Sequence, residues 1–278
     1  RRIPGMGQKR GAMKAGLDWG GSFADAVLWD GSLLASYSVP SRDTTAEKLL
    51  QGLLDQQGFS ENDIESVAVT GGDARRIRGK TLIGVPVFVQ DEIRSICLGA
   101  HTLSGISEAV AVSCGTGTAV AYYLAEDGFH PMHLGGTAAG GGTLEGLGRL
   151  LLETDVPGVL TLAEKGKALD LTVKDVVGKG IGIVPADATA AHFAKAETNS
   201  SKADIAASLV HLVAETIGTV ACHAADKTGC ANLVFTGRVA QAAIIQERIN
   251  AVCRIHGKNA HFPENGEYAT AIGAVVQS

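Results

Sequence analysis

The stretch from residue 15 to residue 28 constrains the fold more than any other part of the chain. It runs from an apolar strand through an acid, two glycines and a small hydroxyl into a second strand with alternating polarity. Such a glycine turn brings the backbone amides of Gly20, Gly21 and Ser22 together at a tip, and glycine lets that tip approach phosphate oxygens closely. Asp18, at the end of the first strand, suits a hydrated Mg²⁺, which prefers one or two carboxylates together with phosphate. The sequence therefore predicts a phosphate-binding hairpin.

The same arrangement returns about a hundred residues later. A predicted strand over 109–113 leads into a second turn of glycine and hydroxyl residues, and a strand over 119–125 follows. The turn consists of Gly115, Thr116, Gly117 and Thr118. Duplication of one lobe, with a nucleotide gripped in the cleft between the copies, explains the repeat. We therefore predict an α/β protein with two ribonuclease-H-like lobes, an N-terminal lobe over 13–106 and a C-terminal lobe over 107–278.

Two further glycine motifs fall in the C-terminal half. Gly140, Gly141 and Gly142 precede a predicted helix, where free amides and the helix dipole favour an anion. Gly237 ends a strand over 232–236 and is placed to meet a nucleotide base or ribose. Its neighbour Arg238 either stacks on adenine or faces solvent. Apolar periodicity predicts helices over 46–57, 202–228 and 269–276.

Charge and composition exclude several function classes. The formal net charge is −5, which gives no general argument for nucleic acid or an anionic membrane as a partner. No run approaches the roughly 18 apolar residues of a membrane span. The basic residues at positions 1–12 lack the apolar run of a signal peptide and suggest a flexible tail.

The cysteines and histidines also lack the spacing of metal or disulfide frameworks. Five cysteines at positions 97, 114, 222, 230 and 253 form no CxxC motif, which indicates reduced cysteines in a cytoplasmic protein. His192, His211 and His223 lack metal-ligand spacing, so we expect them to be structural.

Taken in order, seven motifs carry a resemblance to a known family: Gly16–Ser22, Thr70–Asp73, Gly115–Thr118, Gly135–Gly142, Gly146–Gly148, Glu264–Gly266 and Ala271–Ala274. They resemble the acetate/sugar kinase, heat-shock ATPase and actin superfamily and, within it, the type II pantothenate kinases. The resemblance spans residue 13 to the C-terminus. It implies an actin-like ATPase fold with ATP and Mg²⁺ as cofactors, and ATP phosphates at the three glycine motifs. It also implies a homodimer formed through the second lobe, and transfer of the γ-phosphoryl group to a primary hydroxyl of pantothenate in coenzyme A biosynthesis.

Three positions depart from the family pattern. Where the family has a phosphate-binding lysine, a catalytic glutamate and a substrate-binding arginine, this chain has Asp25, Gln90 and His133. An aspartate near a triphosphate repels it, and an amide cannot accept the substrate proton. Gln90 and His133 remain candidates for substrate binding, although His133 also fits a plain surface residue.

A carboxylate nearby offers a replacement base. Sugar kinases of the superfamily place their base two residues further along, which corresponds to Glu92; Asp91 is the weaker candidate. Both also fit acidic residues that stabilise the first turn of a helix. Three alternatives stay open: a kinase of another hydroxylated molecule, a nucleotide-binding relative without turnover, and an ATPase activator of a dehydratase. The last needs paired cysteines for an iron–sulfur cluster that bridges a dimer, and the scattered cysteines argue against it.

Overall fold

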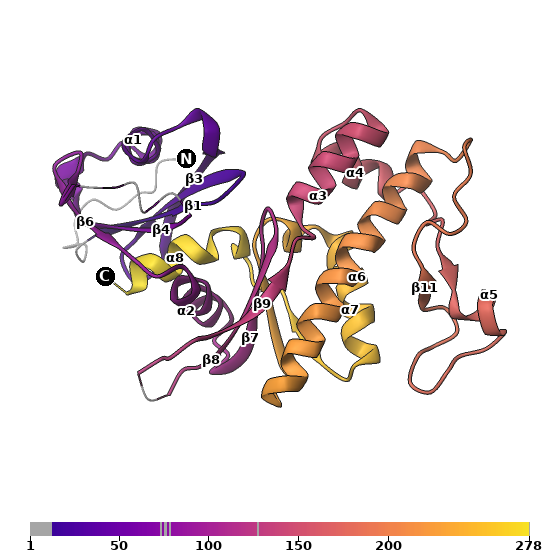
Figure 1. Ribbon diagram of the computed structural model, residues 1–278. Helices are drawn as coiled ribbons and strands as arrows, with labels where there is room; N and C mark the ends of the chain where they lie inside the picture. The colour runs from indigo at the N-terminus through magenta and orange to yellow at the C-terminus, as the bar shows by residue number, and fades with distance from the viewer. Residues whose placement is uncertain (1–12, 73, 75–76, 78, 127, 278) are drawn as a thin grey trace. The chain divides into compact units, whose positions relative to one another are not determined.

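The computed structural model describes residues 13–72, 74, 77, 79–126 and 128–277. The predicted tail over 1–12 and Asp73 of the Thr70–Asp73 motif lie outside the described residues. The chain folds as two compact units, one of residues up to Gly99 together with those from Tyr268 on, the other of Ala100–Glu267 (Figure 1). This grouping differs from the lobes predicted from the sequence, because the C-terminal helix packs with the first unit.

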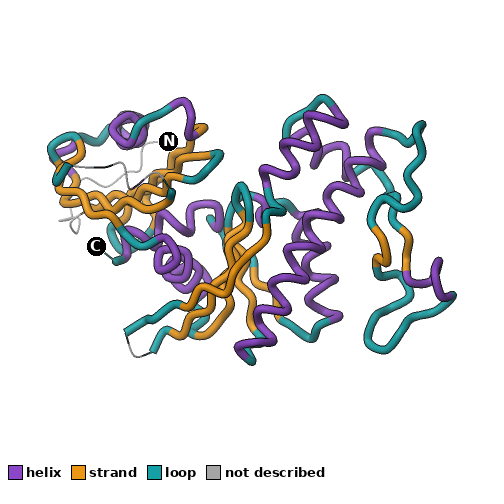
Figure 2. Tube along the Cα trace, in the orientation of Figure 1, coloured by secondary structure: helices purple, strands orange, loops and turns teal. Residues whose placement is uncertain are grey.

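The first unit contains a six-stranded sheet in the order β3-β2-β1-β4-β6-β5. Its strands are β1 (Met13–Trp19), β2 (Phe23–Trp29), β3 (Leu33–Pro40), β4 (Ile64–Gly71), β5 (Thr81–Leu82) and β6 (Val85–Val89). Its helices are α1 (Ala46–Gln57), α2 (Glu92–Ser104), which runs on past Gly99, and α8 (Ala269–Val276). The first three strands are antiparallel, whereas β1, β4 and β6 run parallel. Figure 2 shows α1 on one face of this sheet and α8 on the other.

The two faces of β1 are packed differently. Ala15 and Leu17 are buried in a core with the leucines of α1. Gly16 points to the other face, where a Cβ would lie 2.2 Å from the backbone oxygen of Ala271 in α8. Only glycine allows a helix backbone to approach a strand this closely. This contact explains why the end of the chain belongs to the first unit.

The second unit contains a five-stranded sheet in the order β13-β12-β7-β8-β9. Its strands are β7 (Glu108–Cys114), β8 (Thr118–Leu124), β9 (Met132–Thr137), β12 (Asn232–Thr236) and β13 (Asn259–His261). Its helices are α3 (Gly141–Leu147), which continues into a π-helical turn over Gly148–Leu152, α4 (Val156–Ala163), α6 (Lys202–Thr228) and α7 (Ala243–Ile255). The core lies between this sheet and α6 and α7.

Helix α6 is the central helix of the second unit. Its apolar positions, such as Leu209, Val213 and Ile217, are fully or almost fully buried. Among the described helices, it is the one that is long and apolar enough to cross a membrane by length and composition. Since 61% of its most apolar window is buried inside the structure, these properties also fit a core helix.

A segment that we call the arm, residues 171–191, contains β10 (Leu171–Thr172), α5 (Val173–Val177) and β11 (Thr189–Ala191). Hydrogen bonds fasten its two ends to α6 and α7. Glu215 in α6 accepts hydrogen bonds from Thr189 Oγ1 (2.8 Å) and from Arg248 Nε of α7 (2.6 Å).

The other fastening point is Asp170, which is 6% exposed. It accepts hydrogen bonds from the Phe193 N–H (2.9 Å) and lies 2.9 Å from His211 Nδ1 and 3.4 Å from His192 Nδ1. Burial alone would raise the pKa of Asp170, but the hydrogen bonds from the two histidines and the Phe193 N–H outweigh it and hold the pKa well below its usual value. Both histidines thus contribute to the structure.

The third histidine that we expected to be structural also packs within the protein. His223 packs edge-on against His256 with ring centroids 5.5 Å apart. All five cysteines are free and buried. No group of three or more His, Cys, Asp or Glu side chains that could hold a metal ion occurs in the described part of the chain.

Candidate functional site

A row of polar residues crosses the first sheet where its strands end. Asp18 lies opposite Asp25 of β2 on one side and opposite Thr70 of β4 on the other, and Asp25 lies opposite Ser38 of β3. Residues directly opposite in a ladder share one face of the sheet, so this row lies on the face opposite to the Leu17 core. Thr70 Oγ1 donates to the backbone oxygen of Gln90 (3.2 Å), which extends the row to the end of β6.

Asp25 sits inside this row. It is 6% exposed and accepts a hydrogen bond from the Ser38 hydroxyl. One of its carboxylate oxygens is therefore engaged within the sheet.

Gly71 makes room for Asp18. A Cβ at this position would lie 2.7 Å from Asp18 Oδ1, and the φ angle of +93° is one that L-residues rarely adopt. The glycine of the Thr70–Asp73 motif thus allows the strand end to close around the aspartate.

The first glycine turn uses part of its own hydrogen-bonding capacity. The Gly20 N–H donates to the backbone oxygen of Phe23 (3.0 Å) and closes the turn, and Ser41 Oγ donates to the Gly20 oxygen (2.7 Å). The Gly21 N–H makes no hydrogen bond within the described part of the chain. The Gly20 amide thus closes the turn, and phosphate binding at Gly20, Gly21 and Ser22 stays a prediction.

The second and third glycine motifs form one structure. The N–H groups of Gly141 and Gly142 donate to the backbone oxygens of Gly115 (2.8 Å) and Thr116 (2.9 Å). The Gly115 N–H donates to the Gly117 oxygen (2.9 Å). Because these amides are engaged within the protein, the expectation that the run Gly140–Gly142 offers free amides is revised. The start of α3 instead fixes the shape of the Gly115–Thr118 turn.

Gly237 lies against this same turn. A Cβ there would meet the backbone oxygen of Cys114 at 2.4 Å, and its φ is +85°. The Gly237 N–H donates to the backbone oxygen of Gly266 (2.8 Å). The sequence showed the Glu264–Gly266 motif without a role for it, and this hydrogen bond supplies one. Binding of a nucleotide at Gly237 and at the glycine turns stays a prediction.

The candidate bases differ in their partners. Asp91 precedes α2, and its Oδ1 accepts a hydrogen bond from the Arg94 N–H (2.8 Å), which makes it the N-cap of this helix. Glu92 is the first residue of α2, is exposed, and has no hydrogen-bond or ion-pair partner among the described residues. The Gln90 N–H donates to the Val69 oxygen (2.7 Å) and continues the sheet. His133 is exposed on β9.

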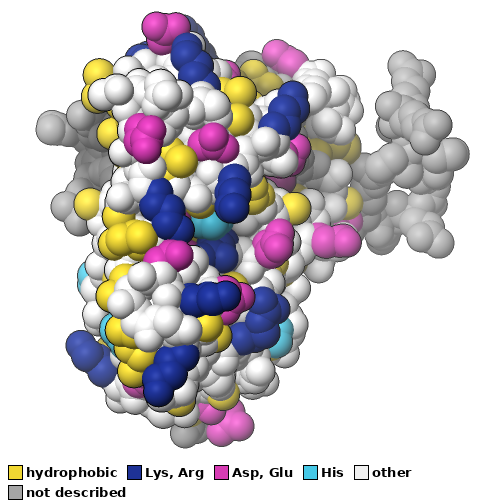
Figure 3. Space-filling model, turned by 90° about the vertical axis from the view of Figure 1, so that its right-hand side faces the viewer, with side chains coloured by type: hydrophobic (Ala, Val, Ile, Leu, Met, Phe, Trp, Pro, Cys, Tyr) yellow, Lys and Arg dark blue, Asp and Glu magenta, His cyan; other side chains and the backbone are white. Residues whose placement is uncertain are grey.

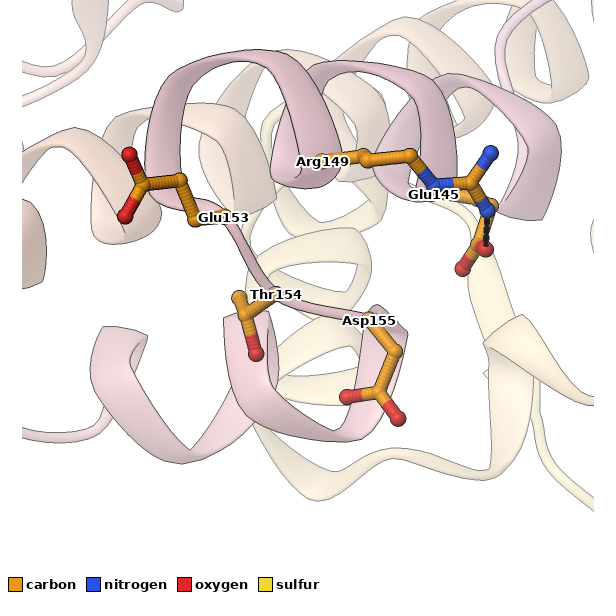
Figure 4. Close-up of a pocket in the computed structure, with 5 residues that line it drawn as sticks. All are labelled: Glu145, Arg149, Glu153, Thr154 and Asp155. Atoms are coloured by element: carbon orange, nitrogen blue, oxygen red, sulfur yellow. Dashed lines mark hydrogen bonds and ion pairs between the residues drawn. The ribbon is translucent and has the colours of Figure 1, made fainter.

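Two surface hollows contain none of these residues. The hollow in Figure 4, of about 420 Å³, lies beside α3 and the loop before α4, with Glu145, Arg149, Glu153, Thr154 and Asp155 in its wall. Figure 4 shows the ion pair between Glu145 and Arg149. The other hollow, of about 550 Å³, lies between the arm and the helices α6 and α7. Neither hollow has a residue of the glycine motifs in its wall.

Comparisons with known proteins match most of the chain. A family model described as Fumble matches residues 108–277. A type II pantothenate kinase from Staphylococcus haemolyticus is 28% identical over 274 residues, which cover 95% of this chain and 99% of the relative. A type II pantothenate kinase from Bacillus anthracis is 27% identical, over 94% of this chain and 96% of the relative.

Solved structures are similar in fold at lower identity. An activator of 2-hydroxyisocaproyl-CoA dehydratase from Clostridium difficile, with bound ADPNP, has a TM-score of 0.69 at 18% identity and covers 95% of this chain and 93% of its own. A ROK family glucokinase from Streptomyces griseus, in complex with glucose and AMPPNP, has a TM-score of 0.66 at 12% identity and covers 96% of this chain and 99% of its own. These likenesses confirm the predicted α/β class with two sheet-containing lobes.

Proposed function

The chain belongs to the Fumble family, and on that premise we propose that it is an ATP- and Mg²⁺-dependent kinase of a small hydroxylated molecule. Pantothenate is the leading substrate, with a place in coenzyme A biosynthesis, because relatives that match almost the whole chain are type II pantothenate kinases. The observation that carries the proposal is the Gly115–Thr118 turn held by Gly141 and Gly142, which lies within the matched residues.

The residues fit a nucleotide and its metal ion. In the second unit the turn is Cβ-free at Gly115 and Gly117, and the Gly117 N–H has no hydrogen-bond partner among the described residues. In the first unit the Gly21 N–H also has no hydrogen-bond partner among the described residues. Asp18 would hold Mg²⁺ through its carboxylate, as suits a hard cation that is also bound by phosphate. Bound ATP supplies the phosphoryl group.

Glu92 is the residue that we assign to the substrate proton. Its carboxylate is exposed and free of partners in the described part of the chain, whereas the Asp91 carboxylate is engaged as a helix cap. Gln90 and His133 would bind the substrate through hydrogen bonds. General-base assistance of this kind contributes about 10²–10⁴-fold to a rate.

A nucleotide-binding protein without turnover is the second candidate. A specific observation favours it: the position of the family's catalytic glutamate is occupied by Gln90, whose amide cannot accept a proton. The dehydratase-activator alternative finds no support in the cysteines, all five of which are buried.

We also propose a cytoplasmic homodimer formed through the second unit. The arm exposes four aliphatic side chains: Val176, Val177, Ile181 and Ile183. Figure 3 looks onto the side of the second unit that carries the arm, and hydrophobic side chains there lie among charged ones. An interface over the arm would remove these four aliphatic side chains from water.

Release of ADP from ATP and Mg²⁺, with and without pantothenate and then with other alcohols and sugars, tests the proposed function. Stimulation by pantothenate supports the full proposal, and stimulation by another compound means a kinase with a different substrate. Tight ATP binding without stimulated turnover favours the second candidate.

A pair of variants then assigns the base. Glu92→Gln is expected to abolish turnover and spare ATP affinity. Loss of turnover in Asp91→Asn instead would assign the proton to Asp91, since asparagine caps a helix about as well as aspartate.

A further inference from the structure

Two buried side-chain polar atoms of the described residues have no hydrogen-bond partner, and both belong to the second unit: Thr236 Oγ1 and Gln241 Nε2. Thr236 is 1% exposed, at the end of β12, and Gln241 ends the short 3-10 turn that follows. A buried donor or acceptor without a partner costs stability, so such groups in a native structure call for an explanation.

The two atoms lie at one place. A Cβ on Gly266 would lie 2.4 Å from Gln241 Nε2 and 3.7 Å from the Thr236 Cα. Gly266 is also the residue whose oxygen accepts the Gly237 N–H. These contacts define one group of neighbouring residues, which we call the wall: Thr236, Gly237, Gln241 and Gly266.

This wall adjoins the glycine turn. Gly237 packs against the backbone of Cys114, the residue before the turn. A Cβ on Gly141, at the start of α3, would lie 3.3 Å from Val239 Cγ2 in the segment that leads to Gln241. The unpartnered atoms thus belong to a segment that packs against the turn that we assign to phosphate.

We propose that Gln241 reads the base of the bound nucleotide and selects adenine over guanine, with the Thr236 hydroxyl as the neighbouring hydrogen-bonding group. This rests on the proposed function, because it requires a nucleotide at the second unit. A carboxamide both donates and accepts, so at the N7 edge of adenine it can donate to N7 and accept from the N6 amine together. Guanine has two acceptors, N7 and O6, at that edge, so one of the two bonds is lost.

The inference requires the Gln241 side chain to turn toward the nucleotide. Gln241 as a residue is partly exposed, although its side-chain nitrogen is buried. Rotation about its side-chain torsions on binding would give this nitrogen a hydrogen-bond partner.

The test measures dissociation constants of two non-hydrolysable analogues, ADPNP and GDPNP, by calorimetry, so it does not depend on catalysis. The unaltered chain is expected to bind ADPNP more tightly. Gln241→Leu is expected to weaken ADPNP binding about tenfold or more and to bring the two analogues close to parity. Thr236→Val is expected to weaken ADPNP binding as well.

Melting temperatures without ligand separate this role from a structural one. Both variants remove an unpartnered buried group, so the ligand-free protein is expected to keep or raise its melting temperature. Gln246→Leu is the matched control: the Gln246 Nε2 donates to the Ala240 oxygen at 2.9 Å. This variant is expected to melt at a lower temperature and to keep the ratio of the two affinities.

The outcomes are distinguishable. If the unaltered chain binds neither analogue, the proposed function fails and this inference with it. If ADPNP binds but Gln241→Leu leaves the ratio unchanged, the inference alone is refuted. A lower melting temperature with unaltered affinities would make Gln241 a structural residue and would also refute it.

Discussion

Substitution of Gly16 by alanine tests how the C-terminal helix is held in the first unit. The added Cβ would lie 2.2 Å from the Ala271 oxygen and 3.1 Å from Val27 Cγ2. The nearest atom is backbone, which cannot rotate away, so β1 and α8 must move apart by more than 1 Å. Because Asp18 is two residues further along β1, this movement also disturbs the strand end that carries it.

The size of the effect follows from two opposing contributions. Overpacking a well-packed interior costs about 1–3 kcal/mol. Replacing glycine by alanine returns about 0.4–1 kcal/mol through the lower entropy of the unfolded chain. We therefore expect a net loss of about 1–2 kcal/mol, which lowers the melting temperature by about 2–8 °C for a protein of this size.

Tryptophan fluorescence is the suitable assay, because both tryptophans of the chain, Trp19 and Trp29, lie in β1 and β2 of the first unit. The control is Gly72→Ala in the same unit, where a Cβ meets nothing within 4 Å. Equal unfolding midpoints for Gly16→Ala and Gly72→Ala would refute the close approach of α8.

Three further predictions concern single contacts. Asp91→Ala removes the N-cap of α2 and is expected to lower stability by about 1 kcal/mol in urea unfolding, whereas Asp91→Asn keeps it. Gly146→Ala, in α3 with open space around the new Cβ, is expected to raise stability by about 0.5–1 kcal/mol; a lower midpoint would contradict the open space. Asp170→Asn is expected to cost about 1–3 kcal/mol at pH 7. Since the pKa of Asp170 is lowered in the folded state, its contribution is present above the ordinary aspartate pKa of about 3.9 and is lost as the pH falls through the lower folded value. The difference between Asp170→Asn and the unaltered chain should therefore shrink below about pH 4 when unfolding is followed by circular dichroism.

Local patterns predicted the elements well. The expected helices over 46–57, 202–228 and 269–276 coincide with α1, α6 and α8, because each has an apolar face at helical spacing and a clear boundary. The grouping of α8 with the first unit was not predictable from such patterns. It depends on Gly16, which carries no apolar signal and matters only through its contact with Ala271.

The glycine turns show the same limit at the candidate site. Their sequence predicted where they lie, but not which amides are free. The Gly141 and Gly142 amides are engaged by Gly115 and Thr116, which are more than twenty residues away. A glycine motif thus indicates a backbone that can approach a ligand or another backbone, and only the fold decides between the two.

The departure at Gln90 can be tested by reversing it. Its structural contacts come from the main chain: its N–H donates to the Val69 oxygen, and its oxygen accepts from Thr70 Oγ1. Gln90→Glu is therefore expected to fold like the unaltered chain, with the same melting temperature. If the missing carboxylate limits catalysis, ADP release with pantothenate should rise by about 10²–10⁴-fold. If release is unchanged while ADPNP still binds, the glutamine is not what limits turnover, and the base belongs at Glu92 or the chain does not turn over.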